Sequence, residues 1–254
     1  MTAFNELQSL QFAWFTADES ATKDIETTFR KVIGTLPDQV QRQRPPATPI
    51  PILVASAVVD TTQFRVQAVP GRVDLFVEPV SNDPSNFPFF SDLAVIQNSL
   101  SKAKAFCQFT GSAGRQSFVV KIAKRLTNAS AFGDEFQKIL GVEHNMSGTA
   151  DLIFQINKVV RLGQLEINRV LRWSAENAQY QQFALNAHGS IAVGPPIGVQ
   201  NTVLGSAHFV SYVMDINTVP NGKSYDAGGQ TSVLEKLGSV VQRCLAFETL
   251  GDVK

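Results

Sequence analysis

The feature that most constrains the fold is a set of β-rich segments separated by very short turns. These segments and turns are 52–60 and 64–79 around Asp60-Thr61-Thr62, and 150–161 and 164–176 around Leu162-Gly163-Gln164. Connections this short join antiparallel neighbours, because a parallel pair needs a crossover of a dozen or more residues. Pro70-Gly71 breaks the segment 64–79, as a bulge or a further hairpin turn would. The turns therefore predict a mainly antiparallel sheet.

Apolar residues at helical spacing predict the helices between these strands. The expected helices cover residues 25–36, about 91–107, 130–140, and from Ser232 almost to the C-terminus. Gly141 is placed to end the third helix, and Ser232 with Glu235 forms a capping box for the last one. The proline-rich stretch from Pro37 to Pro51 is interpreted as an extended surface loop.

The order of these elements nearly repeats along the chain. Strands at 4–16, 117–127 and 208–217 complete the set, and Gly111-Ser112-Ala113-Gly114 marks the break between two passes. The first pass is strand, helix, strand, strand, helix, and the second adds an insertion and one strand. We therefore predict an α+β fold with helices on one face of the sheet. Its two halves, residues 1–110 and 115–254, pack together and suggest a structural duplication.

Composition limits the classes of partner. Lys and Arg number 22, as do Asp and Glu, so no net field attracts nucleic acid or an anionic membrane. The charged fraction of 17% is low, which favours contacts between copies of the chain. No apolar run is long enough to span a membrane. We expect no membrane partner, and without a signal peptide we expect a cytoplasmic protein.

The residue types that most often ligate transition metals, cysteine and histidine, are few in this sequence and widely separated. Cys107 and Cys244 lie on helix faces that we expect to be buried, as core residues in a reducing compartment. The three histidines lack the spacing of a zinc site, so we expect no metal and no cofactor.

The segment 165–173 combines charge with an aromatic residue. Arg169 and Arg172 beside Trp173 could stack on bases or bind phosphates. The favoured interpretation is an ordinary strand whose arginines pair with Glu166 and Glu176. Further basic residues, Arg125 among them, also lie in the second half. The strands there are the best candidates for nucleic-acid binding.

Asp215 is an acid within an otherwise apolar strand. Between Met214 and Ile216, it could be a buried general acid with a raised pKa. An ion pair with Arg125, Arg169 or Arg172 would also explain it, and we favour that structural role. A hydrolase that uses Asp215 or Glu248 as its acid is the least favoured function.

The stretch Gly189–Gly205 is the most promising functional loop. It contains Pro195, Pro196 and Ile197 between glycines and has few charges. Long insertions in compact domains are usually functional or disordered. Low charge favours contact with a partner or an oligomerisation arm, and a β-excursion that covers the sheet edge is equally consistent.

Three short motifs resemble those of a sporadically distributed family of uncharacterised bacterial proteins of similar length. They are Lys124-Arg125-Leu126-Thr127-Asn128, Met214-Asp215-Ile216-Asn217 and Leu245-Ala246-Phe247-Glu248-Thr249. Asn217 stands where the family has a second acid, and the family's opening motif is absent. The resemblance implies a cytoplasmic bacterial or phage-associated protein, and it brings no established activity.

These features together predict a non-enzymatic binding or assembly protein that self-associates through its sheet face or loops. The alternative is a nucleic-acid-associated protein that uses the basic strands of the second half.

Overall fold

The structure is a computed structural model. It describes residues 4–16, 24–44, 51–81, 83, 86–141, 149, 151–185, 199–247 and 251, with no side-chain description for 180–185 and 199–204.

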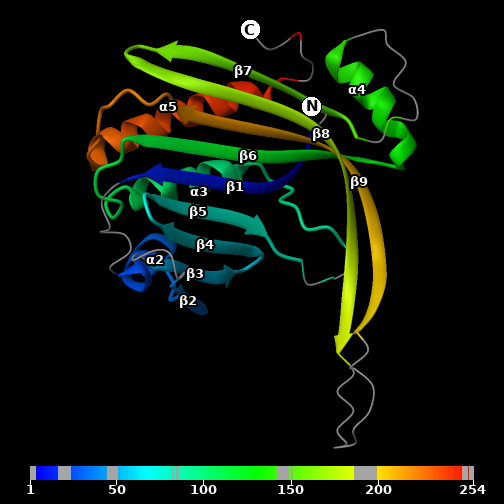
Figure 1. Cartoon of the computed structure of the whole chain (residues 1–254), viewed down its shortest axis with the longest axis horizontal. Helices are drawn as coiled ribbons and strands as arrows, with labels where there is room; N and C mark the ends of the chain where they lie inside the picture. Colours follow the sequence, from blue (N-terminus) through cyan, green and yellow to red (C-terminus); the bar gives the residue numbers. More distant parts are fainter. Residues whose placement is uncertain are drawn as a thin grey trace, which may run out of the picture.

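Within the described residues, nine strands form a single sheet, and every pairing between them is antiparallel (Figure 1). The strands are β1 (Glu6–Phe15), β2 (Gln39–Gln43), β3 (Ile52–Val59), β4 (Thr62–Val69), β5 (Arg72–Pro79), β6 (Arg115–Leu126), β7 (Ile153–Leu162), β8 (Leu165–Leu185) and β9 (Val199–Thr218). Their order across the sheet is β2-β3-β4-β5-β1-β6-β9-β8-β7. The helices are α2 (Ile25–Ile33), α3 (Ala94–Phe106), α4 (Phe132–Leu140) and α5 (Ala227–Leu245), with a 3-10 turn η1 (Ala129–Ala131) before α4. The predicted α+β fold with a mainly antiparallel sheet is confirmed.

The two halves of the chain repeat one topology. Each half begins with a strand and a helix, contains a three-stranded meander whose last strand returns beside the first, and ends with a helix; the first half has the edge strand β2 in addition, before its meander. In this comparison β1 corresponds to β6, β3–β4–β5 to β7–β8–β9, and α3 to α5. The halves join where β1 pairs with β6, so they share one sheet.

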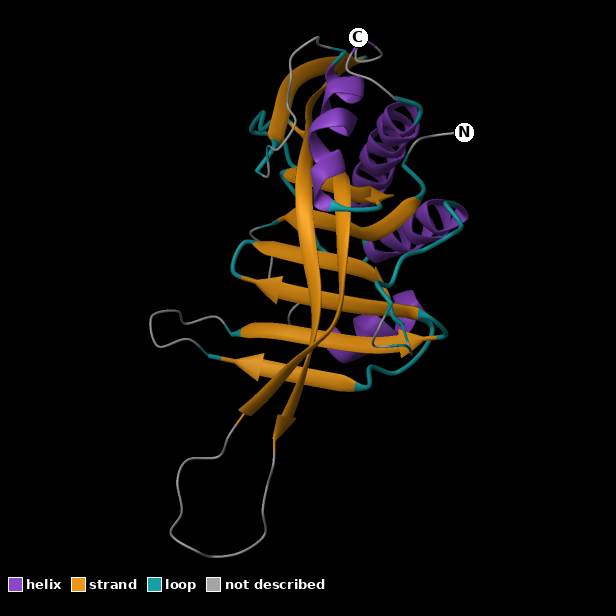
Figure 2. Cartoon of the chain, turned by 90° about the vertical axis from the view of Figure 1, so that its right-hand side faces the viewer, coloured by secondary structure: helices purple, strands orange, loops and turns teal. Residues whose placement is uncertain are grey.

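The helices cover one face of this sheet, and the core lies beneath them (Figure 2). Along β6, Gln116, Phe118, Val120 and Ile122 point toward the helices and are at most 1% exposed. At the join, Phe12 of β1 stacks on Phe118 with ring centroids 4.3 Å apart. The alternation of the strands therefore directs one continuous apolar layer inward and leaves the opposite face open.

Local signals explain the ends of two helices. Gly141 adopts the left-handed conformation that a C-terminal cap requires, as predicted (φ 64°). Helix α5 begins earlier than the predicted capping box, because the Asp226 carboxylate accepts a hydrogen bond from the Gly229 backbone N–H at 2.8 Å. Ser232 lies within this helix, and its hydroxyl donates to the Gly228 carbonyl.

Three regions of the sheet refine or correct the prediction. Residues 39–43 form β2 at the sheet edge and are not only a loop. Of the two predicted alternatives at Pro70-Gly71, a bulge or a hairpin turn, the structure has the hairpin turn, which divides β4 from β5. The expected loop Gly189–Gly205 is shorter, because β9 already begins at Val199 and β8 continues to Leu185.

Strands β8 and β9 extend well beyond their neighbours. The pairing of β6 with β9 ends at His208, whereas β8 and β9 stay paired as far as Leu185 and Val199. We call residues 177–185 and 199–207 the arm. Figure 1 shows this ribbon continuing past the end of β6 and bending away from the other strands. Within the described chain the arm strands pair with each other alone.

Candidate functional site

The open face of the sheet and the arm at its end are the candidate site. Open-face positions alternate with the buried ones, so in β6 and β9 they are the odd-numbered residues. In β8 they are the even-numbered residues, because Val170 lies opposite Asp215 and Arg172 opposite Val213.

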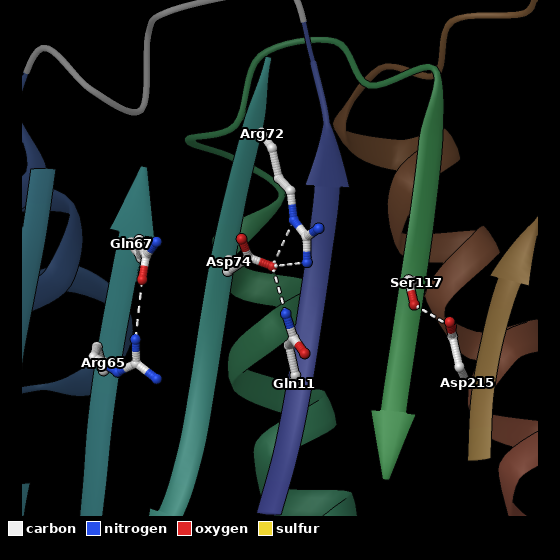
Figure 3. Close-up of polar contacts among 7 residues, drawn as sticks. All are labelled: Gln11, Arg65, Gln67, Arg72, Asp74, Ser117 and Asp215. Carbon is white, nitrogen blue, oxygen red and sulfur yellow. Dashed lines mark hydrogen bonds and ion pairs between the residues drawn. The ribbon is translucent and has the colours of Figure 1, made fainter. Parts of the chain in front are cut away.

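In the first half, a buried carboxylate organises this face (Figure 3). Asp74 of β5, whose side chain is only 5% exposed, accepts hydrogen bonds from Gln11 at 2.8 Å and from two nitrogens of Arg72 at 2.8 and 3.0 Å. Phe15 lies between two guanidiniums, with those of Arg72 and Arg115 at 5.1 and 4.9 Å from its ring centroid. These charge-assisted contacts hold the side chains in place.

In the second half, Asp215 is part of a hydrogen-bonded chain and not of an ion pair. Its Oδ1 accepts from the Ser117 hydroxyl at 2.7 Å, as Figure 3 shows, and from the Asn217 amide at 3.0 Å. Arg115 in turn donates to the Asn217 Oδ1 at 2.8 Å. The expected ion pair of Asp215 with an arginine is therefore wrong for the described residues, because Arg169 faces the helix side of the sheet and Arg125 pairs with Glu6.

The predicted cluster of Arg169, Arg172 and Trp173 is divided between the two faces of the sheet. Trp173 is 2% exposed and stacks on Tyr212 in the core, with ring centroids 4.6 Å apart. Arg169 is 6% exposed and faces the same side, beneath α5. Arg172 is exposed on the open face. Since successive residues of a strand point in opposite directions, these three residues form no common surface for bases.

Arg125 anchors the base of the arm. It pairs with Glu6 at 3.0 Å, and its guanidinium lies 5.2 Å from the ring centroid of Phe209 and 5.8 Å from that of Phe89. A small apolar cluster supports the same place; it contains Ala123, Ala207 and Phe209, with Phe87 and Ala178 against them. We therefore assign Arg125 a structural role that orients the arm.

Charges on the open face are nearly balanced. The ion pairs formed by its strand residues are Arg65–Glu78, Arg72–Asp74, Lys121–Glu176, Arg125–Glu6 and Arg161–Glu166. Among the described strand cations of this face, Arg115 and Arg172 alone have no carboxylate within ion-pair distance. A surface of matched charges offers phosphates little attraction.

Several other sequence candidates give no site. Pro195, Pro196, Ile197 and Glu248 lie outside the described residues. In the part of the chain that the structure covers, no three His, Cys, Asp or Glu side chains gather as metal ligands would. No helix there has the length and apolar character needed to cross a bilayer.

Burial controls the chemistry of both cysteines, which are free thiols in the core as predicted. Loss of hydration raises the pKa of Cys107 and of Cys244 to about 11, which makes each a poor nucleophile at neutral pH.

Sequence reasoning missed Asp74 and Arg115, which join neighbouring strands of the open face. The signal for Asp74 was present, because it stands between Val73 and Leu75 in an apolar strand, as Asp215 does. Asp74 has one partner, Arg72, on its own strand, but Gln11 lies on β1, and the Arg115 partner Asn217 lies on β9, so the register of the sheet is needed to identify these cross-strand contacts.

Comparisons with family models, curated proteins and solved structures give no match. The resemblance found in the sequence therefore stays a prediction.

Proposed function

We propose that this protein is a non-enzymatic assembly module whose β8–β9 arm contacts a second copy of the chain. The observation that supports this proposal most strongly is the arm itself, in which two strands leave the sheet and pair only with each other within the described residues.

A ribbon of this kind needs a partner surface. An isolated two-stranded hairpin is at best marginally stable in water, because it buries little apolar area. The sequence of this region also lacks the charges that keep an exposed ribbon solvated. No Asp, Glu, Lys or Arg occurs between Glu176 and Asp215. Contact with another chain would stabilise the arm and give its neutral composition a role.

A second copy is the partner that the bulk properties favour. The chain has a net charge of zero and a charged fraction of 17%, so two copies repel each other little. Nucleic acid has less support, because Trp173 is buried and most cations of the open face already have carboxylate partners.

The test is to remove the arm and leave the sheet intact. Gln179 pairs with Ser206, so an Asn-Gly turn that replaces residues 180–205 would close the shortened hairpin in a two-residue loop. We expect the intact chain to form a dimer or higher oligomer in sedimentation equilibrium, and the shortened chain to be a monomer with a similar melting temperature. A strictly monomeric intact chain, or a shortened chain that associates equally well, would contradict the proposal.

A further inference from the structure

We propose that a pocket at the end of β6 opposite to the arm binds a phosphate group, either free or at the end of a small polar ester. The pocket has a volume of about 470 Å³ and lies between the end of β1, the start of β6 and the loop that follows β9. This volume falls within the range of about 300–1,000 Å³ that is typical of small-molecule sites. Because the arm lies at the other end of β6 and β9 (Figure 1), the site is independent of the proposed assembly function.

A change of register forms this hollow. Ser117 of β6 pairs with Asn217 of β9, whereas Ala113 pairs with Tyr225 through two backbone hydrogen bonds of 2.9 and 3.1 Å. From one pair to the other, the β6 side advances by four residues (113 to 117) and the β9 side by eight (217 to 225). The extra residues of the loop 219–224 therefore bulge out from the pairing and form one wall of the pocket.

Hydrogen bonds within this loop fix its shape. The Asn221 side chain accepts from the Lys223 backbone N–H at 3.0 Å and donates to the Tyr225 hydroxyl at 3.2 Å. Gly222, between them, adopts the left-handed conformation that the turn requires (φ 72°). The wall is therefore ordered before a ligand arrives, which lowers the entropy cost of binding.

The charge of the lining selects an anion. The charged side chains of the described lining are both cations, Arg115 and Lys223. No described carboxylate lies within ion-pair distance of either. Asp226, the acid nearest to Lys223 in the sequence, caps α5 by accepting from the Gly229 N–H. Two cations without a paired acid favour a doubly charged phosphate over a singly charged carboxylate.

Arg115 supplies the fixed charge of the site. Its guanidinium lies 4.9 Å from the ring centroid of Phe15 and donates a hydrogen bond to the Asn217 Oδ1 at 2.8 Å. Its Nε is buried and has no partner among the described residues. Asp215 is linked to this group through the Asn217 amide and not directly. A half-buried guanidinium with a neutral acceptor is incompletely satisfied, so an anion in the pocket would offset the cost of its desolvation.

The rest of the lining favours a small polar body on the phosphate. Ser112 and Ser224 are exposed at the pocket, where their hydroxyls can bond to oxygens of a ligand. Phe15 is the one aromatic residue of the described lining, and the guanidiniums of Arg72 and Arg115 lie against its ring. Since these cations occupy the ring, it offers no platform for stacking a nucleobase.

The experiment is isothermal titration calorimetry of the full chain with inorganic phosphate and with glycerol 3-phosphate. A phosphate-free buffer of low ionic strength limits the screening of the exposed Lys223. Acetate and glycerol serve as comparison ligands, because they carry a single charge and the hydroxyl groups alone. We expect one site per chain for both phosphates and much weaker binding of acetate and glycerol. Free phosphate and the ester share the proposed chemistry, and the tighter of the two identifies the preferred source.

Two exposed lysines provide matched variants. Lys223→Gln removes the loop cation, and we expect it to weaken both phosphates about threefold to tenfold. Lys236→Gln removes an exposed lysine of α5 outside the described lining and should leave binding unchanged. Arg115→Gln should weaken binding about tenfold or more, with circular dichroism to check its fold.

Three results would overturn the proposal. They are the absence of saturable binding at millimolar phosphate, equal binding of acetate, and an affinity of Lys223→Gln equal to that of Lys236→Gln. The oligomeric state is measured separately, so a failure here leaves the assembly proposal intact.

Discussion

Apart from the edge strand β2, the two halves of the sheet share a topology, but one pair of corresponding hairpins differs in length. In the first half, β4 and β5 are 8 residues each and turn at Pro70-Gly71 beside the other strands. In the second half, the corresponding β8 and β9 are 21 and 20 residues long. The first hairpin stays within the sheet, and the second continues into the arm. The part of β8 and β9 that corresponds to β4 and β5 contributes to the shared core. The additional residues of β8 and β9, which form the arm, are not needed for that core, so we assign them to function.

This comparison assumes that the halves form one cooperative unit, which the join between β1 and β6 can test. Phe118→Ala removes half of the stack with Phe12 and should lower the free energy of unfolding by about 3–5 kcal/mol. Urea denaturation followed by circular dichroism and by tryptophan emission should give coincident transitions, since Trp14 and Trp173 lie in different halves.

The matched control is Val119→Ala, the next residue on the open face, for which we expect a much smaller loss. Two separated transitions in the parent protein would show that the halves fold independently, and the account of a shared core would then be incorrect.

The carboxylates of β5 and β9 offer a comparison at corresponding strands. Asp74→Ala should cost about 1–3 kcal/mol, because it leaves the Gln11 amide and the Arg72 guanidinium without their common acceptor. Asp215→Ala should cost less, since its carboxylate accepts from two neutral groups and is only half-buried. Chemical denaturation of both variants measures the difference. A larger loss at Asp215 would reverse the roles that we assign to them.

The core of the second half contains a buried hydroxyl group that has no hydrogen-bond partner among the described residues. The Tyr212 hydroxyl is buried with no hydrogen-bond partner among the described residues, and burial raises its pKa well above the usual range. Tyr212→Phe keeps the stacking on Trp173 and should leave stability unchanged or raise it by up to about 1 kcal/mol. Thermal unfolding checks this, and a clear loss of stability would mean that the hydroxyl does have a partner.

The smallest expected effect concerns the thiols at the ends of the corresponding helices α3 and α5. Burial raises the pKa of Cys107 and Cys244 from about 9 to about 11. The folded state therefore binds the proton more tightly than the unfolded state, and its advantage decreases as the pH rises from 9 through 11. At pH 9.5 we expect a loss below about 1 kcal/mol per thiol, measured by urea denaturation. Cys107→Ala and Cys244→Ala should each reduce this pH dependence, and an unchanged dependence in both would contradict it.

The sequence predicted the parts of the fold that depend on local patterns. Short turns predicted antiparallel pairing, and Gly141 predicted the end of α4. Strand β2 was missed because Gln39–Gln43 is exposed throughout and has no apolar alternation, so its pairing with β3 alone defines it. The length of β8 and β9 was missed because residues near Gly189 and Gly205 are typical of loops.

To predict the candidate sites, one must know which face of the sheet each side chain occupies. Alternation along β8 could have separated Arg172 from Arg169 and Trp173, because their parities differ.

Hydrogen exchange at two protein concentrations tests the central claim, that the arm serves assembly while the sheet stands alone. Amides of the arm should be protected at high concentration and lose that protection on dilution, because contact with a second copy is what stabilises them. Amides of β1 and β6 should stay protected at both concentrations. Arm amides that exchange equally fast at both concentrations would contradict the claim.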